Sequence, residues 1–425
     1  MSPKKLAAEF SADQLDKLFL PLKGFRHLAL AVSGGPDSTA LMLLAAQWKG
    51  PAKFSVLTVD HGLRAASRNE AKQVVKWARS LGLAAHMLAW KEAKPKSALQ
   101  ARAREARYRL MAQWCARHDA DGLVTAHTLD DQAETLLMRL ARGSGIDGLS
   151  AMAGDTVIFG VRVLRPLLEV SRERLRDFLI GRGQGFFEDP SNADPAFERI
   201  RIRQAGRQLA ELGLKPGALA LAARRLARAR QALEQAADEV EACSVAFQRE
   251  GHAVVDLAVF QKAPEEIRLR LLARLLERIG GASQPAQLGE IERLNEWLKS
   301  GHGQARTLGG CRVQRRSKSL IVGRECGRMA VQPVRIKPGQ TLLWDDRFRI
   351  RLNRGSRKSM EILPLGEAKD RADVKRPKNL PDFVFKALPA LMSNGHVAMV
   401  PQIGYSRPGL GSGSGAEIVP AAGFS

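Results

Sequence analysis

Two periods of hydrophobicity alternate along the first half of the chain. Short apolar runs of strand length are separated by longer stretches whose apolar residues recur at helical spacing. The expected strands cover residues 28–32, 54–59, 84–89, 122–126 and 157–164, the last as a strand or hairpin. The expected helices cover residues 10–23, the stretch that follows residue 38, 70–81, 99–118 and 131–142. This order predicts a doubly wound, mostly parallel α/β sheet with helices on both faces.

The pattern changes twice in the second half. From residue 204 onward Ala, Leu and Arg dominate, and helices are expected near 218–247, 264–279 and 286–298. After Gly301 short strand-like runs are separated by turn residues, and the run GSGSG at 411–415 is typical of a flexible segment. We therefore expect three domains: an α/β domain over 1–205, a helical domain over 206–300 and a small β-rich domain over 301–425.

A short loop joins the first expected strand to its helix. It reads Ser33-Gly34-Gly35-Pro36-Asp37-Ser38. Glycines let backbone amides approach a ligand closely, and Ser38 or Asp37 is expected to cap the helix. Exposed amides at the positive end of a helix favour a phosphate group, although an ordinary strand-turn-helix would have the same pattern.

Two other phosphate-binding motifs are excluded. The sequence has no Gly-Lys-Ser/Thr, so it has no Walker A loop. Gly143, Gly145 and Gly148 form G-x-G-x-x-G, but this run follows a helical stretch instead of a strand. We interpret it as a turn that ends the helix.

Polar side chains gather where the expected strands end. Asp60 and His61 follow the second strand, and His127 follows the fourth. The carboxyl ends of parallel strands meet at one edge, which is where such sheets bind ligands. Nearby, Asp131 and Glu134 are three residues apart and would share one helix face. Paired carboxylates there suit a magnesium ion or a substrate ammonium.

Two of these features have a simpler structural interpretation. The acidic residues after His127 would also fit a capped helix start, with Asp130 as the cap and Glu134 in the first turn. Further along, Arg199, Arg201 and Arg203 alternate with isoleucines. They are either a solvated basic edge or the source of an arginine that meets a phosphate or carboxylate in the active site.

Charge points to a polyanionic partner. The chain has 67 Lys and Arg against 44 Asp and Glu, a formal net charge of +23, and residues 301–425 hold 22 of these cations but only 9 acids. RNA or DNA is the expected partner, although a generally basic composition would give the same totals. Four scattered cysteines fit a reduced cytoplasm. No apolar run has the length of a membrane span, so we expect a cytoplasmic protein without membrane contact.

Six sequence blocks stand in order within residues 26–205. They read SGGPDS, VDHGLR, QARAREARYRLM, AHTLDDQAETLLMRLARGSGIDGL, RPLLEVSRERL and FEDPSNAD. Taken together, they resemble the tRNA(Ile)-lysidine synthase family of PP-loop ATP pyrophosphatases. The resemblance implies the adenine nucleotide α-hydrolase-like fold for the first domain and tRNA binding for the other two. It is looser after residue 300.

The resemblance implies a two-step reaction on an isoleucine tRNA with a CAU anticodon. The wobble cytidine is adenylated by ATP, and free L-lysine then replaces AMP at carbon 2 of the base. The product, lysidine, pairs with A, so the tRNA reads AUA and accepts isoleucine. Mg²⁺ would assist the first step, and the family resemblance allows a homodimer.

Residue roles follow from the same resemblance. The implied catalytic residues are Asp37, Arg107, His127, Asp131, Glu134 and Arg199. Those expected to bind ATP are Ser33, Gly34, Gly35, Pro36, Asp37, Ser38, Asp60 and His61, with Asp37 as the metal ligand. Asp131, Glu134 and Arg199 would hold lysine, while Arg107 and His127 would contact the adenylate.

Three other classes of protein share part of this pattern. A PP-loop thiolase that delivers sulfur to tRNA usually carries paired cysteines, which this sequence lacks. A small-molecule amidating or NAD-forming synthetase would not need the basic stretch 301–425. A nucleic-acid-binding protein with an inactive nucleotide site would not need an intact SGGPDS together with Asp131 and Glu134.

Overall fold

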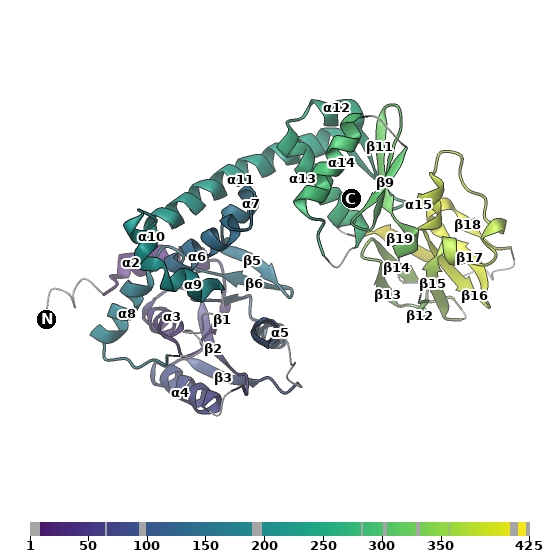
Figure 1. Cartoon of the computed structure of the whole chain (residues 1–425). Helices are drawn as coiled ribbons and strands as arrows, with labels where there is room; N and C mark the ends of the chain where they lie inside the picture. The colour runs from purple at the N-terminus through teal and green to yellow at the C-terminus, as the bar shows by residue number, and fades with distance from the viewer. Residues whose placement is uncertain are drawn as a thin grey trace. The chain divides into compact units, whose positions relative to one another are not determined.

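The computed structural model separates into two compact units, Met1–Arg230 and Gln231–Ser425 (Figure 1). It describes residues 9–63, 66–92, 99–188, 198–281, 284–300, 304–328, 332–356, 358–408 and 415–421. Most of the polar loop after Phe187 and most of the GSGSG run lie outside these residues. The domain boundaries expected at 205 and 300 remain predictions.

A six-stranded sheet forms the centre of the first unit. Its order is β3-β2-β1-β4-β6-β5, and all neighbouring strands are parallel except β5 and β6. The strands are β1 (His27–Ala31), β2 (Lys53–Asp60), β3 (Ala84–Ala89), β4 (Gly122–Val124), β5 (Asp155–Ile158) and β6 (Val161–Leu164). The expected mostly parallel sheet is confirmed, and the uncertain stretch 157–164 is part of a hairpin.

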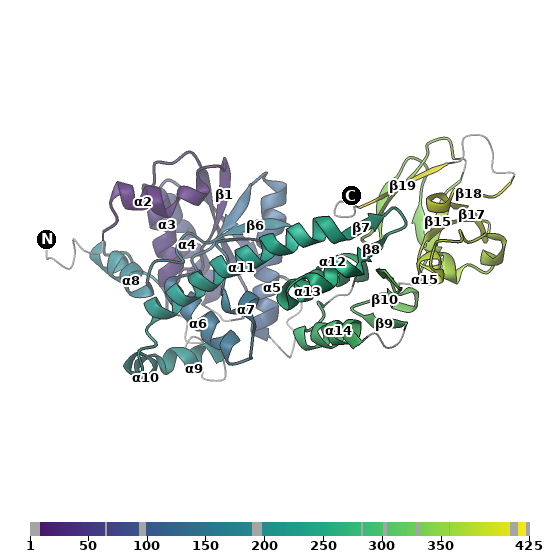
Figure 2. The same ribbon diagram turned by 90° about the horizontal axis from the view of Figure 1, so that it is seen from above.

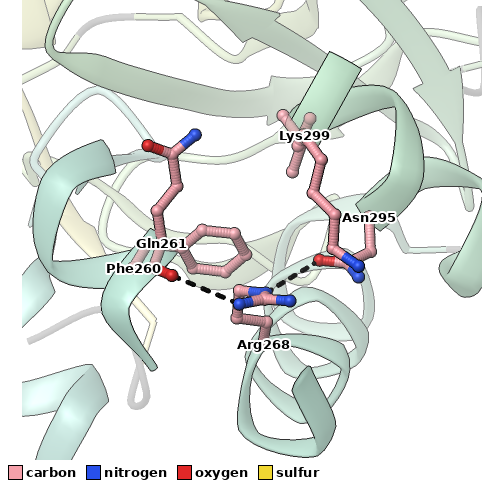
Figure 3. A pocket seen from close by; sticks show the side chains of 6 residues that line it. Phe260, Gln261, Arg268, Asn295 and Lys299 are labelled. Atoms are coloured by element: carbon pink, nitrogen blue, oxygen red, sulfur yellow. Dashed lines mark hydrogen bonds between the residues drawn. The ribbon is translucent and has the colours of Figure 1, made fainter. Parts of the chain in front are cut away.

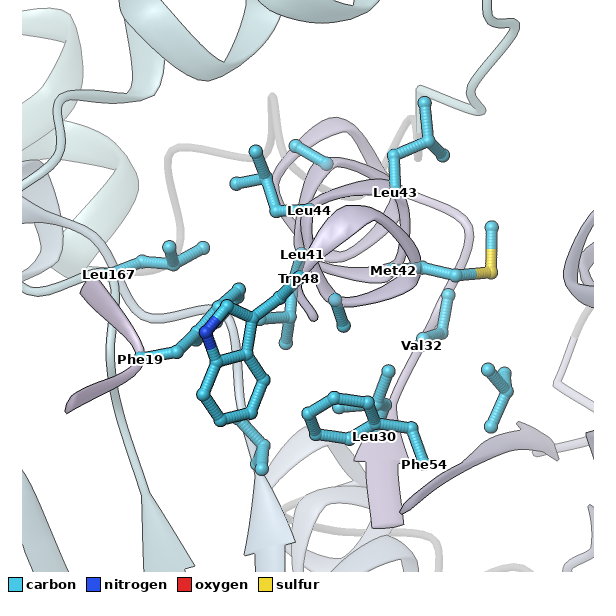
Figure 4. Packing of buried hydrophobic residues seen from close by; sticks show 14 of the residues in the cluster. Phe19, Leu30, Val32, Leu41, Met42, Leu43, Leu44, Trp48, Phe54 and Leu167 are labelled. Atoms are coloured by element: carbon cyan, nitrogen blue, oxygen red, sulfur yellow. The ribbon is translucent and has the colours of Figure 1, made fainter. Parts of the chain in front are cut away.

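Helices cover both faces of this sheet because its strands alternate their side chains between two cores. Leu28 and Leu30 of β1 pack in the core that contains residues of α3 (Pro36–Gln47), α4 (Ser67–Ser80) and α8 (Arg172–Gly181). Figure 4 shows Leu30 in this core with the apolar side chains of α3. Ala29 faces the opposite core, beside α5 (Leu99–Arg117). Figures 1 and 2 accordingly show α5 across the sheet from α3 and α8. The doubly wound arrangement thus follows from apolar residues on both strand faces.

Helix α3 is buried on nearly all sides. Leu41, Met42 and Leu44 are fully buried, and Leu43 is almost so. Burying each such side chain stabilises the fold by about 1.5–3 kcal/mol relative to leaving it exposed. The helix that follows the glycine loop is therefore held rigidly against the sheet, which fixes the position of the loop.

The order of the strands creates a crevice at β1. Parallel pairing places Leu28 opposite Phe54 of β2 and Ala29 opposite Leu123 of β4. The chain therefore leaves β1 toward β2 and β3 on one side and resumes with β4 on the other side. Ligands of open α/β sheets bind at such a switch point, outside the carboxyl ends of the strands.

The helices expected over 10–23, over 131–142 and near 218–247 correspond to α2 (Ala12–Leu18) with η1 (Leu20–Leu22), to α6 (Leu129–Leu140) and to α11 (Pro216–Ser244), which starts in this unit. The sequence pattern did not indicate α8 or the short helices α7 (Ile146–Leu149), α9 (Glu198–Gln204) and α10 (Gly206–Glu211). The G-x-G-x-x-G run lies where α6 ends, and Gly143 there has a φ of 68°. This confirms that the run is a helix-ending turn.

The second unit begins with a helical layer packed on a five-stranded antiparallel sheet. Its helices are α12 (Leu257–Lys262), α13 (Glu265–Gly280) and α14 (Leu288–Ser300), and its sheet has the order β7-β8-β11-β10-β9. The strands are β7 (Val245–Gln248), β8 (His252–Asp256), β9 (Ala305–Leu308), β10 (Cys311–Arg315) and β11 (Ser319–Arg324). The sequence pattern did not indicate β7 and β8, which pair with each other, and β8 also pairs with β11 from beyond residue 300.

The last part of the chain is β-rich, as expected. One sheet has the order β12-β15-β16-β17-β18 and another the order β13-β14-β19. These strands are β12 (Val334–Ile336), β13 (Thr341–Trp344), β14 (Phe348–Leu352), β15 (Met360–Pro364), β16 (Pro389–Ser393), β17 (His396–Val400), β18 (Tyr405–Ser406) and β19 (Ala416–Pro420). Short helical segments η3 (Cys326–Arg328), η4 (Leu365–Glu367), η5 (Arg371–Asp373), α15 (Asp382–Lys386) and η6 (Pro401–Ile403) connect them. Within the described parts of the chain, no helix combines the length and apolar character needed to cross a bilayer.

Candidate active site

The glycine loop places uncapped backbone amides at the start of α3. The N-cap residue is Gly35, followed by Pro36, and no side chain caps this end. The expectation that Ser38 or Asp37 caps the helix is therefore wrong, because Pro36 starts the helix before them. The Ser38 hydroxyl instead donates to the Gly35 carbonyl at 3.1 Å and accepts from the Ser33 amide at 3.2 Å. The helix end is left open to an anion.

A second segment fixes the loop from the side. The Phe187 amide donates a 2.9 Å hydrogen bond to the Gly34 carbonyl, and the Phe187 ring stacks on Trp77. Gly34 has a φ of 88°, and a Cβ at this position would lie 2.7 Å from the Phe187 ring. Only glycine fits here without strain.

Asp37 faces the crevice from the first turn of α3. Its Oδ2 lies 3.3 Å from Nε of Arg172, whereas its Oδ1 is buried and has no hydrogen-bond partner among the described residues. Burial raises the pKa of this carboxyl to about 6, against the opposing effect of Arg172. An unpaired, buried carboxylate oxygen is what a bound cation would satisfy.

Helix α6 begins at a reciprocal cap that fixes Asp131. Thr128 is the N-cap, and Asp131 Oδ2 accepts hydrogen bonds from both the amide and the hydroxyl of Thr128 at 2.9 Å. The suggestion that Asp130 is the cap is wrong. Asp130 instead accepts a 2.7 Å bond from the backbone amide of Arg172. Burial opposes ionisation of Asp131, but Arg172 and the Thr128 amide lower its pKa below the usual value.

One guanidinium connects the carboxylates of the two helices. Besides Asp37, Arg172 reaches Oδ1 of Asp131 and Oε1 of Glu134, each at 3.2 Å. Asp131 and Glu134 therefore lie on one face of α6, as their spacing predicts. Burial disfavours the Arg172 cation, yet the three facing carboxylates raise its pKa above the usual value.

Glu134 is also held from α9. Arg203 donates to both of its oxygens, at 3.0 and 3.1 Å, in the bidentate geometry that suits a carboxylate. Arg199 lies 3.3 Å from Oε2 of Glu134 and donates to the Thr135 hydroxyl at 3.1 Å. Arg199 and Arg203 are four residues apart, so a helix brings both to one face. Helices α6 and α9 lie side by side in Figure 1.

His127 follows β4 at the same sheet edge. Its Nδ1 lies 2.9 Å from the Thr125 hydroxyl. Burial is the main reason that its pKa falls to about 4, against the opposing attraction of Asp131. The imidazole is therefore neutral near pH 7. Arg107 lies on α5, half-buried, and burial followed by repulsion from Arg104 lowers its pKa.

Asp60 and His61 lie at the end of β2, as expected, but their described contacts are local. Asp60 Oδ1 accepts from the Ser67 hydroxyl at 2.6 Å and from the Gly62 amide at 3.0 Å. The Ser67 hydrogen bond is the main reason that the pKa of Asp60 is lowered. His61 Nδ1 accepts from the Leu63 amide at 3.1 Å.

The sequence analysis missed Arg172 and did not single out Arg203. Arg172 is the first residue of α8, after the N-cap Ser171, within a run that also contains Arg174 and Arg176. Nothing in that run distinguishes the arginine that turns toward the acids. Arg203 could have been found, because its four-residue spacing from Arg199 is a helical signal.

The carboxylates of this site are too few to hold a metal ion without further ligands from substrate or water. Among the residues that the structure describes, no three His, Cys, Asp or Glu side chains are grouped so as to hold a metal ion. Mg²⁺ is commonly bound by one or two carboxylates together with substrate phosphates and water. Asp37, with its unpaired Oδ1, meets that requirement.

A separate cavity of about 270 Å³ lies in the second unit. Phe260, Gln261, Arg268, Asn295, Leu298 and Lys299 line it (Figure 3). Arg268 donates to Oδ1 of Asn295 at 3.1 Å, and Lys299 donates to Glu265 at 3.1 Å. Both cations are thus already engaged, and none of the residues from the sheet edge takes part.

Comparison with known proteins places the sheet and its loop in one superfamily. Residues 7–209 match the PP-loop domain family. A tRNA(Ile)-lysidine synthase of Bradyrhizobium diazoefficiens is 47% identical over 295 residues, which cover 67% of this chain and 81% of the relative. One of Ruegeria pomeroyi is 40% identical, covering 77% of each chain. One of Wolbachia sp. subsp. Brugia malayi is 32% identical over 409 residues, covering 93% of this chain and 94% of the relative.

Proposed function

Because this chain belongs to the tRNA(Ile)-lysidine synthase family, we propose that it ligates L-lysine to carbon 2 of the wobble cytidine of the isoleucine tRNA with a CAU anticodon. ATP is converted to AMP and pyrophosphate. The resulting lysidine pairs with A, so the tRNA decodes AUA and accepts isoleucine. The observation that carries this proposal is the meeting of an open phosphate loop with a buried acidic and arginine-rich cluster at one sheet edge.

The first step adenylates the base. The carbonyl oxygen on carbon 2 of cytosine attacks the α-phosphate of ATP, and the bond to the β-phosphate breaks as pyrophosphate leaves. The uncapped amides that follow Gly35 and the Ser33 and Ser38 hydroxyls would hold the phosphates. Asp37 would hold Mg²⁺, which neutralises charge on the leaving pyrophosphate when bound.

The second step replaces AMP by lysine. The ε-amine of lysine attacks carbon 2, loses a proton, and AMP leaves. Asp131 and Glu134 would bind lysine ammonium groups, and Arg199 its carboxylate, because both acids lie on one face of α6 against Arg172 and Arg199 of α9 lies 3.3 Å from Glu134. His127 and Arg107 would contact the adenylate. A neutral imidazole there offers a hydrogen bond without adding charge.

The rest of the chain would bind the body of the tRNA. The target base must leave its stack to reach the sheet edge, as it does in other base-modifying enzymes. Residues 301–425 hold 22 Lys and Arg against 9 Asp and Glu, and this excess of 13 positive charges would attract the RNA phosphates. The four cysteines are free thiols, which supports our proposal of a reducing cytoplasmic location.

Mass spectrometry of the tRNA tests this function directly. An isoleucine tRNA transcript with a CAU anticodon is incubated with the protein, ATP, Mg²⁺ and isotopically labelled lysine. We expect a lysine-sized mass gain, with loss of water, on the wobble cytidine and none on a methionine tRNA transcript with the same anticodon. ATP cleavage to AMP without any gain on the isoleucine tRNA would keep the PP-loop chemistry and rule out lysine ligation.

A further inference from the structure

The acidic groups assigned to lysine and the metal are already occupied by the protein's own cations. Glu134 has arginine nitrogens within 3.3 Å of both oxygens. Asp131 uses Oδ2 for Thr128 and Oδ1 for Arg172. Of the carboxylate oxygens of Asp37, Asp131 and Glu134, Asp37 Oδ1 alone lacks a hydrogen-bond partner among the described residues. An ammonium bound between Asp131 and Glu134 would therefore occupy the place that the Arg172 guanidinium now fills.

Arg172 is the cation best placed to be replaced. It makes one hydrogen bond to each of three carboxylates, at 3.2–3.3 Å, whereas Arg203 makes a shorter bidentate pair with Glu134. Single contacts of this length are weaker than a bidentate pair. Its backbone, in contrast, is fixed, because its amide donates to Asp130 at 2.7 Å at the start of α8. The guanidinium can thus leave while its anchor remains.

Buried carboxylates that face one another repel unless a cation lies between them. Asp37 comes from α3, while Asp131 and Glu134 come from α6. Arg172 joins the two helices, so it keeps the acidic residues of the ATP side and the lysine side together when neither ligand is bound. Resting on the lysidine-forming function proposed above, we propose that Arg172 is a positioning residue that occupies the ammonium site in the ligand-free protein and is replaced there by substrate lysine.

The consequence is a competition between an internal cation and the substrate cation. Lysine binding has to break the Arg172 contacts with Asp131 and Glu134, so its affinity is lower than that of an empty acidic site. In return, a small cation that diffuses into the site does not bind there unless its contacts are strong enough to replace Arg172. Arg172 thereby contributes to selectivity by opposing ligands that cannot form enough contacts to replace it.

Equilibrium binding of labelled lysine to the full chain, without ATP or tRNA, tests the proposal. Arg172→Ala should bind lysine more tightly by roughly three- to tenfold, the range of one partly buried ion pair. Free guanidinium at low millimolar concentration should return its affinity toward that of the unaltered protein by refilling the vacated place. Arg172→Lys should resemble the unaltered protein. Guanidinium should have little effect on the unaltered protein, whose site is already filled.

The matched control is Arg176→Ala, one turn further along α8. Arg176 is largely exposed and pairs with the exposed Glu188 at 2.8 Å, so lysine affinity should stay unchanged. Circular dichroism establishes that each variant is folded, and Arg172→Gln replaces Arg172→Ala if the smaller side chain prevents folding. Unchanged or weaker lysine binding in a folded Arg172→Ala or Arg172→Gln, or no response to guanidinium in Arg172→Ala, would overturn the proposal. Failure of the unaltered protein to transfer lysine to tRNA is a separate result, which would overturn the proposed function.

Discussion

The backbone amide of Phe187 donates a 2.9 Å hydrogen bond to the carbonyl of Gly34, and its ring covers the α-carbon of that glycine. The phosphate loop is thus fixed by a segment that lies more than 150 residues later in the sequence. Both the left-handed backbone of Gly34 and the nearby ring exclude a side chain. This relationship makes Gly34 a sensitive position for testing the loop.

Gly34→Ala should weaken ATP binding by about tenfold or more, because a strained φ alone costs about 1–3 kcal/mol. Nucleotide binding measured by calorimetry checks this. Gly24→Ala is the matched control, since Gly24 is exposed and its added Cβ would have no neighbour within 4 Å. Adding Phe187→Ala to Gly34→Ala removes the ring clash but leaves the strain, so it should restore binding only in part. Full ATP affinity in Gly34→Ala would show that the loop rearranges freely.

Asp37→Asn should reduce adenylation, measured as tRNA-dependent exchange of ATP and pyrophosphate, by about 100-fold or more, because metal assistance supplies several kcal/mol. Mg²⁺ binding to the unaltered protein should also weaken below about pH 6, where the raised pKa of Asp37 leaves its carboxyl protonated and neutral. Unaltered exchange in Asp37→Asn would remove this residue from the metal site.

Glu134→Gln should raise the KM for lysine by about 10- to 100-fold, the value of a charge-assisted hydrogen bond, with a smaller effect on the KM for ATP. Steady-state lysine transfer to tRNA measures both. Glu169→Gln is the control, because Glu169 is an exposed carboxylate that pairs with Arg224 on the surface. An equal rise in both KM values would mean that Glu134 maintains the whole site and does not bind lysine selectively.

Arg347→Ala should lower the free energy of unfolding by about 2–6 kcal/mol, because it leaves two buried carbonyl groups without their donor, at about 1–3 kcal/mol each, while Asp345 keeps its ion pair with Arg324. Arg347 is fully buried and donates to Asp345, to the Gly251 carbonyl and to the Ala387 carbonyl, at 2.7–3.1 Å. Denaturant titration checks this, with Arg349→Ala on the exposed face of β14 as the control. Equal stabilities of the two variants would contradict the structural role of Arg347.

Replacing Arg349 and Arg351 together by Gln should weaken tRNA binding and flatten its dependence on salt. The logarithmic slope should change by up to about 0.9 for each RNA phosphate that an arginine no longer neutralises. Both side chains are exposed and alternate with the buried Phe348, Ile350 and Leu352. The substitutions should therefore leave the fold intact. Binding measured at several salt concentrations checks this, and an unchanged slope would mean that these charges do not meet the RNA.

The paired substitutions of Arg349 and Arg351 test the role of the basic residues 301–425 better than deletion of these residues would. Deleting residues 301–425 would take β9, β10 and β11 out of a sheet that also contains β7 and β8. Any decrease in tRNA binding would then combine the removal of charge with damage to the fold. The expected boundary at residue 300 does not reveal this, because strand pairing across it depends on partners distant in sequence.

Much of the first unit could be predicted because the relevant signals are local. Alternating and helical periods depend on neighbouring residues, so the expected stretch 84–89 coincides with β3 and the stretch 54–59 lies within β2. The glycines and Pro36 define the loop through backbone sterics alone. The spacing of Asp131 and Glu134 determines their common face for the same reason. The predicted N-caps of α3 and α6 were wrong, because Gly35 and Thr128 occupy these N-cap positions instead of the residues that we expected.

By itself, the sequence determined the order of strands and helices, the phosphate loop, and the acidic pair that follows the fourth strand. The tertiary structure alone decided which cation faces those acids. Arg172 meets Asp37 across 135 positions of sequence and Asp131 across 41. No local period encodes such a contact, because it exists only when α3, α6 and α8 have packed around one sheet edge. The same reason explains β8, whose pairing with β11 requires chain closure around the intervening helices.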